Sequence, residues 1–168
     1  MTSLVPIPQT FAQIVSFAVY GRPQQKGSKR VFPVRSSQVR DRAPRQDYIV
    51  RDDNPRAKPW ASTISARAAE AYSGPLIRSA VGVELAFYFR RPKGHFGTGR
   101  NASRIKPGAP VEMITTPDVD KLARCAIDAL TGIVIADDSL IVELCARKLY
   151  GEPERVEVRV LEFAEVPS

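Results

Sequence analysis

The strongest constraint on the fold is a strictly alternating stretch, residues 81–89, in which every second residue is apolar. Its odd-numbered positions are Val81, Val83, Leu85, Phe87 and Phe89. Successive side chains of a strand point to opposite faces, so this pattern predicts a β-strand with one face in a core. A chain of 168 residues is long enough for one such core, and 43% hydrophobic residues can fill it.

Further strands and two helices are predicted around this strand. The strands are expected at residues 14–20, 31–34, 48–51, 140–149 and 155–163, and the helices at 59–72 and 119–131. Trp60, Ile64 and Ala68 fall at helical spacing, which favours a core position for Trp60 over a base-stacking role. Gly132 is typical of a helix C-terminus. Strands interspersed with helices indicate an α/β (α+β) domain.

Composition excludes several classes of protein. No apolar run reaches the roughly 18 residues of a membrane span, and residues 1–15 lack the basic start of a secretory signal. We therefore expect a cytoplasmic protein without a membrane partner. Cys125 and Cys145 lie in apolar segments and are expected to be reduced and buried. With the single His95 they cannot supply the four ligands of a zinc finger.

Charge is unevenly distributed along a chain whose net charge is +7 at pH 7. Residues 21–58 carry 11 Lys or Arg against four Asp, and residues 90–110 carry six against no acid. We interpret both regions as long basic loops, about 21–58 and 90–117, that contact a polyanion; solubilising surface is the alternative. The local net charge is negative in residues 118–168, which carry 11 acidic and six basic residues. Carboxylates beside a polyphosphate repel it unless a cation lies between them, which favours metal-assisted phosphodiester chemistry.

The sequence GHFGTGRN at 94–101 resembles a phosphate-binding P-loop only superficially. Arg100 stands where that motif needs Lys, and Asn101 where it needs Ser or Thr. Pro107 and Pro110 also prevent the helix that would follow. We therefore predict no nucleotide cofactor, and a basic loop that can touch a phosphate backbone.

Two acidic pairs flank the second predicted helix: Asp118 and Asp120 at its start, Asp137 and Asp138 beyond its end. Pro117 favours an extended chain before the helix, where carboxylates two residues apart point the same way and can converge on one cation. Each pair alone also suits a helix cap or a tight turn. If the chain runs down the helix and returns as a strand, however, the second pair comes back beside the first. Three or four carboxylates without histidine favour Mg²⁺ or Mn²⁺.

Arg124 lies four residues after Asp120 and four before Asp128, on one helical face. A solvated ladder of ion pairs, worth about 0.2–0.5 kcal/mol each, explains this spacing. The functional alternative places Arg124 beside the metal, where its charge stabilises the transition state of phosphodiester cleavage.

A resemblance to a known family is densest in residues 115–151, TTPDVDKLARCAIDALTGIVIADDSLIVELCARKLYG. This segment resembles the RusA family of Holliday junction resolvases, found in phages and prophage-bearing bacteria. The family pattern has an Asp-x-Asp at the start of a helix, an Asp-Ala-Leu at its end and an Asp-Asp pair before a strand. A looser likeness covers the strand into Arg91-Pro92-Lys93 and the Gly-x-Pro-x-x-Lys motif at 21–26. Residues 31–57 match no part of the pattern.

The resemblance implies a single RusA-like domain over residues 1–168, with a mixed β-sheet, two main helices packed on it and a homodimeric assembly. It also implies an endodeoxyribonuclease that uses Mg²⁺, or Mn²⁺, to cut four-way DNA junctions; in a phage-encoded protein this happens in the host cytoplasm. The family's catalytic acids, which are the expected metal ligands, fall on Asp118, Asp120 and Asp138. Its catalytic lysine is Arg124 here, which keeps the charge but cannot deprotonate, so we expect an electrostatic role. Lys121 stands where many members have Asn.

Basic residues of the two loops and of the helix are expected to bind DNA phosphates, which gives affinity without sequence information. They are Arg22, Lys26, Lys29, Arg30, Arg91, Lys93, Arg100 and Lys121. Two other functions stay open: a non-catalytic DNA-binding or phage-assembly protein, and a metal nuclease acting on another branched or single-stranded DNA.

Overall fold

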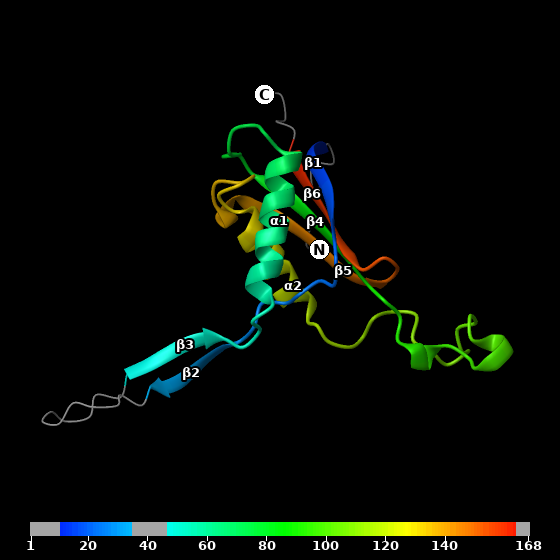
Figure 1. The fold of residues 1–168 in the computed structure, drawn as a ribbon. Coiled ribbons are helices and arrows are strands. Elements are labelled where there is room, and N and C mark those ends of the chain that lie inside the picture. Colours follow the sequence, from blue (N-terminus) through cyan, green and yellow to red (C-terminus); the bar gives the residue numbers. More distant parts are fainter. Residues whose placement is uncertain (1–10, 35–46, 164–168) are drawn as a thin grey trace, which may run out of the picture.

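The computed structural model describes residues 11–34 and 47–163. Its centre is a four-stranded sheet in the order β1-β6-β4-β5 (Figure 1). The strands are β1 (Phe11–Tyr20), β4 (Val81–Phe89), β5 (Ile141–Tyr150) and β6 (Arg155–Phe163). β6 pairs antiparallel with both β1 and β4, whereas β5 pairs parallel with β4. The mixed sheet and all four strand positions are therefore confirmed.

Both helices, α1 (Ala57–Ala71) and α2 (Val119–Leu130), pack on the same face of this sheet (Figure 1). The predicted stripe of Trp60, Ile64 and Ala68 is buried, so Trp60 is a core residue. The Ser65 hydroxyl on α1 donates to the Ala129 carbonyl on α2 at 2.8 Å, which joins the helices. The core fills the space between these helices and the inward face of β1, β6 and β4.

Two glycines end elements, and Gly132 does so as predicted. Gly21 closes β1 with φ 129°, and a side chain there would lie 3.1 Å from the Trp60 ring. Gly132 follows α2 with φ 79°, the left-handed conformation that commonly terminates a helix.

A separate two-stranded hairpin, β2 (Lys29–Val34) and β3 (Asp47–Asp52), projects away from the sheet (Figure 1). It confirms the two short strands expected in this region. Its base is closed at Ser28 and Asp53: the Ser28 N–H donates to the Asp53 carboxylate at 2.7 Å, and the Asp53 N–H donates to the Ser28 carbonyl at 3.2 Å. We call this pair the neck of the hairpin.

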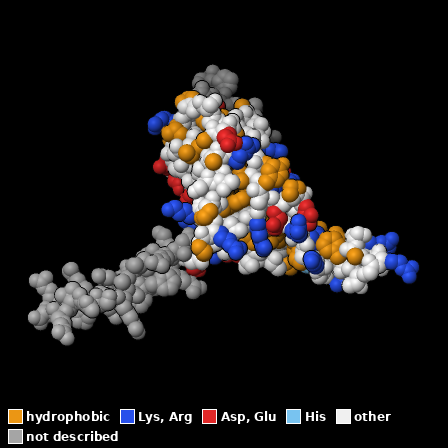
Figure 2. Space-filling model, in the orientation of Figure 1, with side chains coloured by type: hydrophobic (Ala, Val, Ile, Leu, Met, Phe, Trp, Pro, Cys, Tyr) orange, Lys and Arg blue, Asp and Glu red, His pale blue; other side chains and the backbone are white. Residues whose placement is uncertain are grey.

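The long loop 90–117 leaves the end of β4 and projects from the other side of the domain (Figure 1). Its regular structure consists of two 3₁₀ turns, Lys93–His95 and Gly99–Asn101. No α-helix follows the glycines of this loop, as expected for a segment that is not a P-loop. Lys and Arg side chains gather at the far end of the loop (Figure 2).

Two further expectations concern the burial of the cysteines and the length of the helices. No disulfide joins the two cysteines in the described part of the chain, but only Cys125 is buried. Cys145 is half-buried because it lies on edge strand β5, on the sheet face that carries no helix. Among the described residues, neither helix is long and apolar enough to span a membrane.

Candidate active site

The predicted Asp118 lies at the N-terminus of α2, in the N-cap position with extended backbone (φ −75°, ψ 135°). Its side chain makes no capping hydrogen bond. Instead, its carboxylate lies 2.9 Å from the ammonium of Lys121. Helix capping therefore explains the backbone position of Asp118 but not the direction of its carboxylate.

The charges around this pair reinforce one another. The hydrogen bond and charge of Lys121 hold the pKa of the Asp118 carboxyl below its usual range, and Lys148 adds a smaller effect of the same sign. Asp118 in turn raises the pKa of Lys121, with lesser contributions from Asp120 and Asp53. At neutral pH the start of α2 therefore holds an ionised carboxylate and an ammonium in contact.

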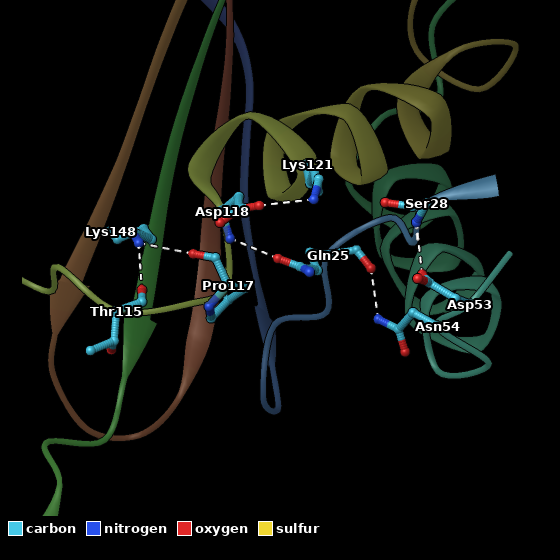
Figure 3. A network of polar contacts seen from close by, with 9 residues as sticks. All are labelled: Gln25, Ser28, Asp53, Asn54, Thr115, Pro117, Asp118, Lys121 and Lys148. Carbon is cyan, nitrogen blue, oxygen red and sulfur yellow. Dashed lines mark hydrogen bonds and ion pairs between the residues drawn. The ribbon is translucent and has the colours of Figure 1, made fainter. Parts of the chain in front are cut away.

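Gln25, in the segment after β1, holds the start of α2 in place (Figure 3). Its side-chain oxygen accepts the Asp118 N–H at 2.7 Å, and its carbonyl accepts from the Asn54 side chain at 2.7 Å. The Lys26 N–H donates to the Lys121 carbonyl at 3.1 Å. Three segments distant in sequence thus meet around Asp118.

Lys148, near the end of β5, holds the segment just before Asp118 from the side opposite Gln25 (Figure 3). Its ammonium donates to the carbonyls of Thr115 at 2.7 Å and Pro117 at 2.9 Å. Sequence reasoning missed both Lys148 and Gln25. Lys148 could have been noticed because it is a charged residue at an inward-facing position of a strand. In the structure it is in register with the core residue Phe87.

The ion-pair ladder that was one explanation for the spacing of Asp120, Arg124 and Asp128 does not form. Asp128 pairs with Lys26 instead, across 102 residues of sequence. Asp120 and Arg124 are exposed, and within residues 11–34 and 47–163 no ion pair joins them. Arg124 is therefore an exposed cation on the helix face that starts with Asp120.

The expectation that Asp137 and Asp138 return beside Asp118 within one chain is wrong. Asp137 accepts the Ser139 N–H at 2.9 Å and so caps the turn that precedes β5; hydrogen bonds from Ser139 lower its pKa. This turn lies beyond the C-terminus of α2, about 18 Å from its start at 1.5 Å per residue. The returning element is β5 itself, so Lys148 rather than Asp138 reaches Asp118. Accordingly, the described residues contain no cluster of three or more His, Cys, Asp or Glu suited to a metal ion.

Two hollows flank the segment that leads into α2. One, of about 380 Å³, has the basic lining residues Arg22, Arg90, Arg91 and Lys93 together with Tyr150 and Thr116. The other, of about 280 Å³, is lined by Arg22, Arg56, Gln25 and Thr116 among others. Since Arg22 and Thr116 line both, the hollows adjoin and form a basic surface immediately before Asp118.

The residues expected to bind DNA fall into four groups. Arg22, Lys93 and Arg100 are exposed and free to meet phosphates, apart from a long 4.0 Å ion pair of Arg22 with Glu154. Arg91 instead stacks on the Tyr150 ring at 4.1 Å and donates to the carbonyls of Pro110 (2.6 Å) and Val111 (3.3 Å), so it ties the two ends of the long loop together. Lys26 and Lys121 are engaged by Asp128 and Asp118. The side chains of Lys29 and Arg30 lie outside the described part of the structure.

Comparison with known proteins identifies the family. The chain is 27% identical over 150 residues to the uncharacterized protein YqaN of Bacillus subtilis (strain 168), an alignment that covers 89% of this chain and 97% of that protein. The profile of the family described as endodeoxyribonuclease RusA matches residues 33–161. This match includes residues 33–57, which the sequence motifs alone did not place. The mixed sheet with two helices and the acid-bearing start of α2 therefore belong to a member of the RusA endodeoxyribonuclease family.

Proposed function

We propose that this protein is a divalent-metal-dependent endodeoxyribonuclease that resolves four-way DNA junctions. The family supplies the general activity. The observation that carries the proposal is the position of Asp118 and Asp120 at the start of α2, beside a basic surface lined by Arg22 and Arg56. Such a surface attracts DNA phosphates to the point where the carboxylates lie.

Asp118 and Asp120 would hold the metal. Mg²⁺ is commonly bound through one or two carboxylates together with substrate phosphates and waters, so the half-buried Asp118 and the exposed Asp120 at one helix start fit it or Mn²⁺. The lowered pKa of Asp118 keeps this ligand ionised. A divalent ion in such a site lowers the pKa of water and offsets charge on the scissile phosphate.

The remaining residues of the site would orient the Asp118 carboxylate and stabilise the charge that develops on the phosphate. Gln25 and Lys148 fix the backbone on either side of Asp118, so they set the direction of its carboxylate. Lys121 and Arg124 are the cations closest in sequence to the acids on α2, and we assign them stabilisation of the charge that develops on the phosphate. Arg124 cannot serve as a base because its guanidinium stays protonated.

DNA binding would rest mainly on phosphate contacts. Arg22, Lys93 and Arg100 are the expected contacts of the described chain, and Arg91 shapes the loop that presents the latter two. Cleavage of a junction with near-twofold symmetry calls for a twofold dimer with two sites.

The test is a cleavage assay on a synthetic four-way junction beside a linear duplex of the same sequence. We expect cleavage of the junction with Mg²⁺, none with chelator, and little cleavage of the linear duplex. Binding without cleavage under every metal condition would favour the non-catalytic alternative. Preferential cleavage of flaps or single strands would favour a nuclease with another substrate.

A further inference from the structure

Lys121 is a cation at the positive end of a helix. It lies in the first turn of α2, three residues after the N-cap residue Asp118. The N–H groups at a helix start carry partial positive charge, so a positively charged side chain is disfavoured there. The helix itself therefore does not favour Lys121 at this position, and the reason for its charge lies in its surroundings.

Three carboxylates lie close to the ammonium of Lys121. Asp118 contacts it at 2.9 Å and is the main cause of its raised pKa. Asp120 and Asp53 raise the pKa of Lys121 further, so both lie near enough to act on it. Carboxylates grouped in this way repel one another. The single ammonium of Lys121 offsets that repulsion.

The contact with Lys121 engages the carboxylate that the proposed metal site needs. Asp118 makes no capping hydrogen bond, and its carboxylate is directed to the ammonium instead (Figure 3). A divalent ion on the same carboxylate would meet the positive charge of Lys121 at short range, and like charges repel. The ammonium and the metal therefore compete for Asp118.

Lys121 is able to leave Asp118 when another acceptor is present. Its side chain is 34% exposed, and lysine carries its charge on a flexible stem of four carbons. The basic hollow lined by Arg22, Arg56 and Thr116 adjoins the segment that leads into Asp118, and such a surface attracts DNA phosphates. A phosphate bound there offers the ammonium a second acceptor.

We propose that Lys121 is a built-in counter-ion that occupies the metal site of the DNA-free protein and moves to a DNA phosphate when the substrate binds. DNA then removes the competitor of the metal, so DNA and metal bind cooperatively. The coupling is reciprocal, and the metal strengthens DNA binding by the same factor. The site is thereby loaded preferentially in the DNA-bound protein. This regulation rests on the proposed metal-dependent cleavage.

Mn²⁺ binding, measured by EPR of the free ion, tests the competition without an activity readout. In the protein alone, Lys121→Met should bind Mn²⁺ about three- to fivefold more tightly than the wild type, the strength of one exposed ion pair expressed as a ratio of Kd values. The second measurement uses a bound four-way junction with phosphorothioate linkages at its branch point, which keep the charge and resist cleavage. Both proteins should then bind Mn²⁺ equally, because the ammonium has left Asp118.

Two control variants accompany this comparison. Lys121→Arg keeps the charge and should retain the wild-type pattern, with weaker Mn²⁺ binding in the absence of the junction. Lys58→Met removes an exposed cation of α1 and should match the wild type in both states.

A fixed charge beside the metal gives a different result from a mobile one. The ratio of Mn²⁺ affinities between Lys121→Met and wild type would then be the same with and without the junction, which overturns the exchange. Equal affinities in both states also overturn it, because Lys121 then does not compete. Mn²⁺ binding that is absent from every form, or that survives Asp120→Asn, refutes the proposed metal site and the counter-ion role with it.

Salt dependence tests where the ammonium goes. With chelator present, Lys121→Met should flatten the dependence of log junction affinity on log salt by about 0.9, the value of one lost phosphate contact. Lys58→Met should keep the wild-type slope. An unchanged slope in Lys121→Met shows that the ammonium does not reach a phosphate and overturns its transfer to DNA, whether or not the protein cleaves junctions.

Discussion

The ammonium of Lys148 donates to the carbonyl oxygen of Pro117 at 2.9 Å, one residue before Asp118. This bond, together with the 2.7 Å bond to Thr115, joins the end of β5 to the start of α2. Asp118 is also held through its own N–H by Gln25. The first carboxylate of the site thus depends on two residues that lie far from it in sequence.

Replacing Lys148 by Met should destabilise the protein and slow cleavage. The two charge-assisted bonds to carbonyls near the protein surface are worth about 1–2 kcal/mol in the free energy of unfolding. Urea unfolding measures this loss, and single-turnover cleavage of a junction measures the rate. Lys58→Met, at an exposed position of α1, serves as the control and should change neither. Wild-type stability in Lys148→Met would show that these bonds do not hold the segment.

Replacing Asp120 by Asn should abolish cleavage and leave the fold and junction binding nearly intact, because Asn keeps the shape but loses the charge that binds a divalent cation. The matched control is Asp128→Asn, two turns further along α2, which breaks only the ion pair with Lys26. Its expected cost is about 0–1 kcal/mol in stability. Activity of Asp120→Asn above roughly a tenth of wild type, a barrier change of about 1.4 kcal/mol, contradicts the metal assignment.

The pKa of Asp118 should rise when Lys121 is replaced by Met, because Lys121 is the main cause of its lowering. A carboxyl with a lowered pKa stabilises the folded state above its unfolded pKa of about 3.9 and loses this contribution as pH falls through its folded pKa. Lys121→Met should therefore lose stability near neutral pH but not below the folded pKa of Asp118. Carboxyl ¹³C NMR titration gives the pKa directly, and an unchanged value would refute the pairing.

Arg124→Ala should lower the single-turnover rate about 10²-fold, or about 2.7 kcal/mol, while the free energy of unfolding changes by less than about 0.5 kcal/mol. The small stability effect is expected because Arg124 is exposed and forms no ion pair with Asp120 or Asp128. Arg124→Lys, the side chain typical of the family, should retain turnover if a point charge suffices. An unaffected rate in Arg124→Ala removes Arg124 from the site.

Neutralising the loop cations Lys93, Arg100 and Arg104 to Gln should flatten the dependence of log affinity on log salt by about two to three units, roughly 0.9 per lost phosphate contact. These three side chains are exposed, whereas Arg91 stacks on Tyr150. Fluorescence anisotropy on a junction at several salt concentrations gives the slope. The same slope in wild type and variant would mean that the loop is solvated surface.

The sequence predicts the elements well because their signals are local. The alternation in β4 reflects one buried face, and so does the apolar stripe of α2, which consists of Leu122, Cys125, Ala126, Ala129 and Leu130. Both elements lie within a few residues of their predicted bounds. The position of Asp118 at the start of α2 is equally local, since Pro117 and the apolar stripe mark the boundary.

Contacts between distant segments are what the sequence does not reveal. Asp128 has Arg124 as its local candidate partner, yet Lys26 reaches it because the segment after β1 packs along α2. Arg91 has the charge expected of a phosphate contact, but its side chain stacks on Tyr150 because β5 ends beside β4. Asp138 was misplaced for a similar reason: its return depends on the direction in which β5 joins the sheet, which local periodicity does not determine.

The neck at Ser28 and Asp53 has a consequence for how such proteins diversify. The β2–β3 hairpin leaves and rejoins the domain at one residue pair and forms its own two-stranded sheet. Its length and composition can change without shifting the register of the four-stranded sheet or the start of α2. Insertions are best tolerated at positions of this kind. Evolution, or an engineer, can therefore exchange the hairpin while the carboxylates at the start of α2 stay where they are.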